Sequence, residues 1–224
     1  MNYYELSSVS NSDLTELRRA YYGIEDPKGL ERVFAFGSLV DAMLSERSKL
    51  NTLSRSLTDD YGVVIYFEIE VWRFAEKLAK ELANDSKVLR LGDSLIGQYV
   101  FNRTLPFIYQ GDEYSIRARC KFDGFSKRFA TGLDYKTLSC TTQKQFVESI
   151  AHFSYDRAAA WYMDLARIDY FWIIGISKIN GKVFKYAIER GSEMHLSGVN
   201  KYSRLAFNWV TLIDGFNDNL KIAA

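Results

Sequence analysis

Two aspartates and a lysine in the middle of the chain have the side-chain types and spacing of a hydrolytic metal site. Asp134 and Lys136 are two residues apart in an alternating segment, so on a β-strand they project from the same face. Asp123 directly follows the preceding alternating segment, and a neighbouring strand would bring its carboxylate alongside. Two carboxylates bind a hard cation such as Mg²⁺, and an adjacent ammonium orients or activates a water. These groups are the minimal equipment for phosphodiester hydrolysis.

The Asp-x-Lys spacing is weak evidence by itself. It occurs three times, at residues 26–28, 85–87 and 134–136. Only the third occurrence lies in a strand pattern and has another Asp upstream, just after a strand. Solvated residues on an exposed sheet face would give the same triplet, so that interpretation stays open at this point.

Cations gather around the third triplet although the whole chain is almost neutral. The 224 residues carry 29 Lys and Arg against 28 Asp and Glu, which excludes a uniformly basic nucleic-acid coat. Between residues 117 and 144, seven cations stand against two anions, a local charge of +5. The seven cations are Arg117, Arg119, Lys121, Lys127, Arg128, Lys136 and Lys144. This field suits a polyanionic substrate, but Lys and Arg guarding a strand edge would give the same pattern.

The elements that must position these residues fall into a helical part and a sheet part. Residues 1–105 are mostly helical in pattern, with a helix capped near Ser10 that runs to about residue 19. A second helix is predicted from about residue 36, and a third over about residues 63–83, where apolar residues recur along one face.

Residues 106–224 are predicted to form a sheet core with helices. The predicted strands cover residues 114–122, 129–136, 170–177 and 183–189. Asp123-Gly124 is expected to end the first of them. A helical stretch is expected over about residues 143–165, broken near residues 153–154, and a closing helix from about residue 198.

Length and composition fit one α/β domain over residues 1–224. The chain is 47% hydrophobic and has 15 Phe, 15 Tyr and 4 Trp, enough apolar surface for a sizeable core. Two cysteines cannot form a zinc ribbon or an iron–sulfur cluster. No apolar run approaches the roughly 20 residues that span a bilayer. We therefore expect a soluble cytoplasmic protein without a membrane partner.

The runs at residues 121–124 (Lys-Phe-Asp-Gly) and 132–137 (Gly-Leu-Asp-Tyr-Lys-Thr) resemble the core of the PD-(D/E)XK nuclease superfamily. Within it, the chain is most similar to the branch of exonuclease VIII and related phage or prophage recombination exonucleases. Residues 8–14 are similar to that branch's opening Ser-x-Ser-x-Leu segment, and residues 36–44 resemble its Gly-Ser-x-x-His-x-x-Leu helix. Residues 155–162 resemble its Gln-x-x-x-Tyr helix. The matches follow the expected order over about residues 8–165.

Two positions depart from the pattern of this family. Asp41 stands where the family usually has a metal-binding His, and Asp also ligates Mg²⁺ through oxygen. Without the resemblance, an ordinary exposed helix residue and a metal ligand are equally open interpretations of Asp41. Ala158 stands where the motif has Gln, four residues before Tyr162, and cannot position nucleic acid or water. Arg157 could contact a phosphate instead, although helical geometry turns it about 100° away, and Tyr162 fits core packing as well as a site.

The resemblance implies a central mixed β-sheet flanked by helices, with the site at one edge of the sheet. It also implies a Mg²⁺-dependent exonuclease that acts on double-stranded DNA ends. Asp41, Asp123 and Asp134 would hold one or two Mg²⁺, or Mn²⁺, and Lys136 would orient or help deprotonate the attacking water. The remaining six cations named above, together with Arg157, would contact DNA.

The resemblance further suggests a homo-oligomer of the phage recombination type, with a single-strand annealing recombinase as a partner. The alternative is a catalytically impaired nuclease-fold protein that binds nucleic acid or a protein partner. Ala158 in place of Gln favours this alternative, whereas the retention of Asp123, Asp134 and Lys136 together argues against it.

Overall fold

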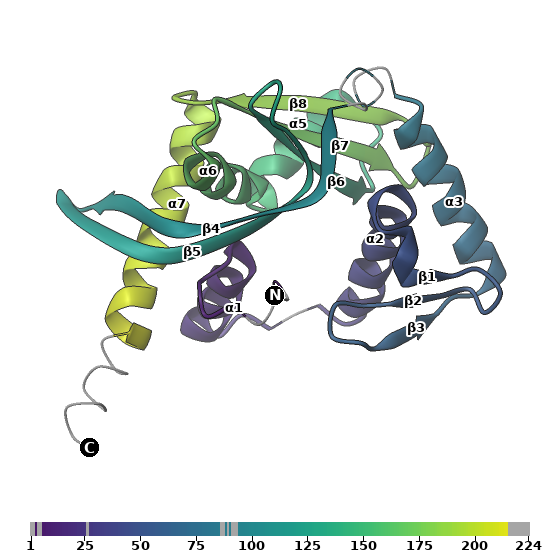
Figure 1. Ribbon diagram of the computed structural model, residues 1–224, viewed down its shortest axis with the longest axis horizontal. Coiled ribbons are helices and arrows are strands. Elements are labelled where there is room, and N and C mark those ends of the chain that lie inside the picture. Colours follow the sequence, from purple (N-terminus) through teal and green to yellow (C-terminus); the bar gives the residue numbers. More distant parts are fainter. Residues whose placement is uncertain are drawn as a thin grey trace.

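A five-stranded mixed sheet forms the centre of the protein (Figure 1). The structure is a computed structural model that describes residue 3 and residues 6–25, 27–85, 88, 90 and 94–214. In sheet order, the strands are β4 (Leu95–Tyr109), β5 (Asp112–Ser126), β6 (Thr131–Leu138), β7 (Tyr170–Ser177) and β8 (Val183–Glu189). β6 and β7 are parallel, and the other neighbours are antiparallel.

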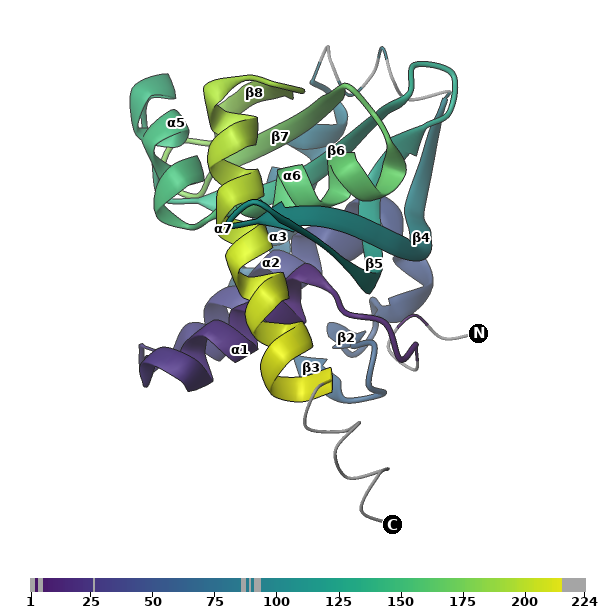
Figure 2. The same ribbon diagram turned by 90° about the vertical axis from the view of Figure 1, so that its left-hand side faces the viewer.

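Helices cover both faces of this sheet. The helices are α1 (Asn11–Tyr22), α2 (Leu30–Ser45), α3 (Ile69–Ala83), α5 (Gln143–His152), α6 (Tyr155–Ala166) and α7 (Glu193–Trp209), which ends in a π-helical turn (Val210–Asp214). Helices α1, α5, α6 and α7 share one core with the sheet, and α2 and α3 share a second core with the opposite face of β6 and β7. Figure 2 shows α7 beside α6 on the first face. The predicted α/β fold, a central mixed sheet flanked by helices, is confirmed.

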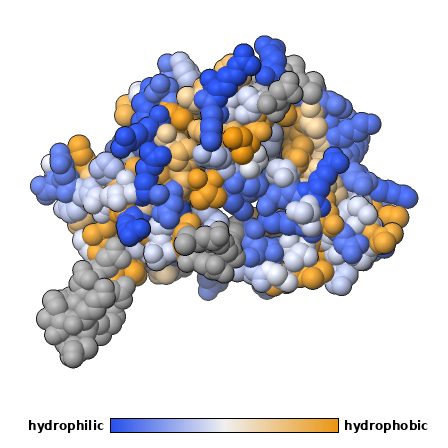
Figure 3. All heavy atoms as spheres, in the orientation of Figure 1, coloured by the Kyte–Doolittle hydropathy of each residue, from blue (hydrophilic) through white to orange (hydrophobic). Residues whose placement is uncertain are grey.

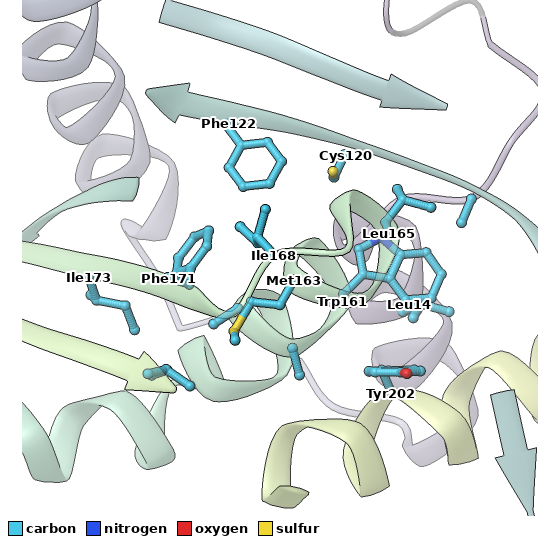
Figure 4. Close-up of a cluster of buried hydrophobic side chains, with 14 of the residues drawn as sticks. Leu14, Cys120, Phe122, Trp161, Met163, Leu165, Ile168, Phe171, Ile173 and Tyr202 are labelled. Atoms are coloured by element: carbon cyan, nitrogen blue, oxygen red, sulfur yellow. The ribbon is translucent and has the colours of Figure 1, made fainter. Parts of the chain in front are cut away.

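In the larger core, aromatic side chains of the sheet and of α6 pack among aliphatic and sulfur-containing side chains (Figure 4). Phe122, Trp161 and Phe171 are fully or almost fully buried in it. The indole Nε1 of Trp161 donates to the carbonyl oxygen of Arg119 at 3.1 Å, which ties α6 to β5. Because a buried indole N–H without a partner would be costly, this bond fixes how α6 sits on the sheet.

A small second sheet connects α2 to α3. It contains β1 (Leu50–Asn51), β2 (Ser56–Thr58) and β3 (Val64–Tyr66), all antiparallel, and follows a 3₁₀ turn at Arg47–Lys49. The sequence pattern does not predict this sheet. Its last strand occupies part of the segment expected to begin the third helix, so α3 begins only at Ile69.

Several predicted boundaries are confirmed. β7 and β8 have the predicted bounds, and the helical stretch after β6 is broken at 153–154 between α5 and α6. Ser10 caps α1 through a capping box: its Oγ accepts the Asp13 N–H at 3.2 Å, and Asp13 Oδ2 accepts the Ser10 N–H at 2.8 Å. This reciprocal pair satisfies two backbone donors at the helix start.

Other predicted boundaries are wrong. Helix α2 begins at Leu30, not near residue 36, and α7 begins at Glu193, not near residue 198. β5 does not end at Asp123-Gly124 but continues to Ser126. A Cβ on Gly124 would lie 3.1 Å from side-chain atoms of Leu133, so close packing explains this glycine and a turn does not.

The chain's N-terminal segment attaches α1 to β5. The Val9 N–H donates to the carbonyl oxygen of Arg117, and the carbonyl oxygen of Val9 accepts the Arg119 N–H, both at 2.8 Å.

No described helix is long and apolar enough to cross a membrane. Hydrophilic side chains cover much of the face drawn in Figure 3, with hydrophobic side chains in separate patches between them.

Candidate active site

Four charged side chains from three elements converge where β5 and β6 separate. Asp123 lies on β5, Asp134 and Lys136 lie on β6, and Asp41 lies on α2, which contacts both strands. The charges of Asp134 and Lys136 act on both Asp41 and Asp123, and the charge of Asp41 also acts on Asp123. The structure therefore places Asp41, Asp123, Asp134 and Lys136 in one neighbourhood.

The backbone of β6 holds Asp123 in place. β5 and β6 pair only at three positions, from Gly124↔Leu133 to Ser126↔Thr131. Beyond them the Tyr135 N–H donates to Asp123 Oδ2 at 2.7 Å, so a carboxylate oxygen replaces a main-chain acceptor. Burial raises the pKa of Asp123 well above its usual range, and the carboxylates of Asp41 and Asp134 raise it further.

Asp134 and Lys136 form an ion pair on one face of β6, as their spacing predicts. The Lys136 Nζ also lies 5.3 Å from the centre of the Tyr155 ring, a cation–π distance. Burial alone would lower the pKa of Lys136, but the charges of Asp134 and Asp123 outweigh burial and raise it. Lys136 is therefore an ammonium at neutral pH.

Asp41 is held by neighbours on α2 and β4. Ser45 Oγ donates to Asp41 Oδ1 at 3.0 Å, and Gln98 Nε2 donates to Asp41 Oδ2 at 3.3 Å. Burial raises the pKa of Asp41, with further increases from Glu46 and Asp134, while the Ser45 hydrogen bond opposes them. Both oxygens of this carboxylate thus have a fixed donor.

A cavity of about 420 Å³ opens beside this cluster. Asp41, Asp123, Gln98 and Tyr162 line one part of it. Its other walls come from the start of α1, from the end of α2 and from the loop between β2 and β3. Asp134 and Lys136 belong to the charged cluster but are not part of the described lining.

The carboxylates are not arranged as a finished metal site. Although Asp41, Asp123 and Asp134 lie in one neighbourhood, no three His, Cys, Asp or Glu side chains in the described part of the chain lie close enough together to hold one ion. Each aspartate is instead bonded to a protein group: Asp134 to Lys136, Asp123 to the Tyr135 N–H, and Asp41 to Ser45 and Gln98.

Two of the predicted DNA-binding cations line the cavity, but both are engaged by acidic residues. Arg119 donates to the carbonyl oxygen of Leu6 at 2.7 Å and to Asp13 Oδ2 at 3.1 Å. Lys121 Nζ lies 3.5 Å from Asp60 Oδ2 in the loop between β2 and β3. The cations that are exposed are Arg117, Lys127, Arg128 and Lys144.

Arg157 and Tyr162 lie on α6 in different surroundings. Arg157 is only 4% exposed and donates from Nε to Asn11 Oδ1 at 2.9 Å and from Nη2 to Thr15 Oγ1, so it joins α6 to α1. Burial, followed by the charge of Arg18, lowers the pKa of Arg157 to about 10. Tyr162 lines the cavity and also packs edge-on against Phe122, with ring centres 5.0 Å apart.

The sequence reasoning missed three polar residues around Asp41. Glu46 and Gln98 line the cavity, and Ser45 bonds both Asp41 and Gln98. The sequence gives a partial signal for Ser45 alone, which lies one helical turn after Asp41. Gln98 lies 57 residues from Asp41 and on a strand that the pattern does not predict.

The pH dependence of the free energy of unfolding should reveal the raised pKa of Asp123. As pH rises from about 4, the unfolded chain releases this proton before the folded protein does, so the metal-free protein loses free energy of unfolding. Asp123→Asn removes this loss and keeps an oxygen for the Tyr135 N–H. The variant should gain about 1.4 kcal/mol over the wild type per unit of pKa elevation.

Urea unfolding in EDTA, followed by circular dichroism between pH 4 and pH 8, checks this expectation. The stability difference between Asp123→Asn and the wild type should widen with pH. A constant difference would show that Asp123 has an ordinary pKa.

Comparison with solved structures finds similar chains at low sequence identity. SSO0001 is 14% identical, and the match covers 94% of this chain and 78% of that chain with a TM-score of 0.45. A phage-related exonuclease from Haemophilus somnus 129PT is 14% identical, and the match covers 81% of this chain and 95% of that chain with a TM-score of 0.42. An alkaline exonuclease, LHK-Exo from Laribacter hongkongensis, is 10% identical, and the match covers 100% of this chain and 98% of that chain with a TM-score of 0.41. No protein-family model matches the chain, and no curated protein matches its sequence.

Proposed function

We propose that this chain is a metal-dependent deoxyribonuclease of the PD-(D/E)XK type that degrades double-stranded DNA from its ends. One observation carries the proposal: Asp41, Asp123 and Asp134 converge from three elements beside Lys136. Burial and neighbouring carboxylates raise the pKa of Asp41 and Asp123, and perturbed carboxylates in a partly enclosed site are typical of functional sites. Motifs in the expected order support the same class of enzyme.

The donor set fits a divalent cation. Three carboxylates beside one ammonium leave a net charge of −2 when all are ionised, and oxygen ligands favour Mg²⁺, with Mn²⁺ as an alternative. Asp41, Asp123 and Asp134 would hold the ion, and to do so their carboxylates would come closer together than they lie in the structure. Burial and mutual repulsion raise the pKa of Asp123 and Asp41, and a cation between the carboxylates would remove that repulsion.

The protein's own groups would orient the reactants. A divalent ion bound there supplies Lewis acidity that offsets charge on the phosphate. Lys136 would orient the attacking water or help to deprotonate it, and its ammonium, which the charges of Asp134 and Asp123 favour in the absence of metal, would offset negative charge on the phosphate. Tyr162, at the cavity wall, would contact the nucleotide.

The cavity supports action at a strand end. About 420 Å³ lies near the small end of the range for ligand pockets, which suits one terminal nucleotide better than a continuous duplex. The exposed Arg117, Lys127, Arg128 and Lys144 would contact the DNA backbone. A role in phage recombination, a homo-oligomeric state and a recombinase partner rest on the motif resemblance alone.

A second candidate function is binding without hydrolysis. Ala158 lacks the amide that the motif has at this position, and Arg119 and Lys121 are held by Asp13 and Asp60 at the cavity. These features favour a nuclease-fold protein that binds nucleic acid or a protein partner without cutting.

One assay separates the two functions. The purified protein is incubated with end-labelled linear duplex or closed circular duplex, in Mg²⁺ or in EDTA. We expect degradation of the linear duplex in Mg²⁺ only, with the circle intact. Survival of linear DNA in both Mg²⁺ and Mn²⁺, together with a shift of that DNA in a native gel, would favour the second function. Cutting of the circle would overturn the requirement for ends.

A further inference from the structure

Gln98 occupies an irregular position in β4, directly across from Asp123. The β4–β5 ladder pairs Gly97 with Gly124 and Tyr99 with Phe122, which brackets Gln98 and Asp123. Gln98 has φ +52°, a left-handed conformation that is unfavourable for a residue with a side chain. Strain of this kind persists only where the surroundings enforce it, and it clusters at functional sites.

The irregular backbone is accompanied by a specific set of side-chain hydrogen bonds. Gln98 Nε2 donates to Asp41 Oδ2 at 3.3 Å and to Ser45 Oγ at 3.0 Å, and Ser45 Oγ donates to Asp41 Oδ1. The amide therefore connects β4 to the last turn of α2 and fixes one oxygen of Asp41. Gln98 also lines the cavity together with Asp123.

We propose that Gln98 is a positioning residue that holds the Asp41 carboxylate ready to bind the divalent ion. The proposal rests on the proposed function, because it assigns Asp41 to that ion. A hydrogen bond that orients a ligand carboxylate raises metal affinity by reducing the reorganisation needed on binding. Strain in the backbone at residue 98 is then the cost of placing the amide beside Asp41.

Two glycine variants test this role. Gln98→Gly removes the amide and relieves the positive φ. Gln110 has φ +54° and lies in the turn between β4 and β5, outside the cavity lining. Gln110→Gly therefore controls for the effect of relieving backbone strain alone. Mg²⁺ and Mn²⁺ affinity is measured by titration calorimetry, and the metal-free melting temperature by circular dichroism.

We expect Gln98→Gly to weaken metal affinity about 10-fold or more, with a melting temperature at or above that of the wild type. Gln110→Gly should raise the melting temperature and leave metal affinity unchanged. Wild-type affinity in Gln98→Gly would overturn the proposal, as would a large fall in its melting temperature accompanying the affinity loss. A wild-type protein that binds neither ion would instead overturn the proposed function.

Discussion

Asp134→Asn is expected to lower the rate of hydrolysis of linear duplex DNA by about 10³-fold, the scale on which a preorganised electrostatic group contributes to catalysis. The substitution keeps the size of the side chain but removes one of the three negative charges that would hold the ion. It also removes the partner of the Lys136 ammonium. Both the ion and the residue that orients the water would therefore be affected.

The fold should survive this substitution. Loss of the ion pair with Lys136 destabilises the protein, but loss of the repulsion between Asp134 and Asp123 stabilises it, and the two effects oppose each other. Asp112→Asn is the matched control, because Asp112 is an exposed aspartate at the start of β5. Initial rates in Mg²⁺ compare the three proteins. An Asp134→Asn protein as active as the control would contradict the proposed site.

Gly198→Ala is expected to destabilise the fold by about 3 kcal/mol, the upper part of the usual range for overpacking. Gly198 lies on α7 where it crosses α6. A Cβ there would be 2.2 Å from the carbonyl oxygen of Asp156 and 2.8 Å from the Cβ of Ala160. A backbone carbonyl inside a helix cannot move aside alone, so α7 must shift away from α6.

That shift would disturb buried polar contacts as well. The fully buried Asp156 accepts hydrogen bonds from Lys201 at 2.6 Å and Ser197 at 2.9 Å, both on α7. For a chain of this length, about 3 kcal/mol corresponds to a fall of about 10 °C in melting temperature. Asn200→Ala, an exposed position on α7, is the control for thermal unfolding. A melting temperature for Gly198→Ala equal to that of the control would contradict this packing.

The parts of the sheet that the sequence predicts well have a local signal. β7 and β8 are bounded by turn residues and rich in β-branched and aromatic residues, so their ends are visible in the chain itself. β4 has no such signal. It is an edge strand that contains Pro106 and exposes apolar residues such as Ile108, and its order depends on pairing with β5.

The residues of the candidate site also differ in how well the sequence predicts them. Asp123, Asp134 and Lys136 are predictable because strand periodicity and motif order place them. Gln98 is not, because its role depends on a contact with α2 that only the folded chain creates.

Counting charges along the sequence also overstates the number of cations that are exposed to solvent. Arg119 is paired with Asp13, 106 residues away, and Arg157 with Asn11, 146 residues away. Arg119 and Arg157, which the sequence assigned to DNA, are therefore buried and bonded within the protein. Periodicity and motif order carry no information about such pairs.

The most direct test of the account is the position of a bound ion. Crystals grown in Mn²⁺ and measured at the Mn absorption edge should show one or two anomalous peaks among the carboxylate oxygens of Asp41, Asp123 and Asp134, at about 2.1 Å from their ligands. A peak there would establish that these three side chains form one metal centre. Well-ordered carboxylates at millimolar Mn²⁺ with no anomalous peak between them would contradict the account.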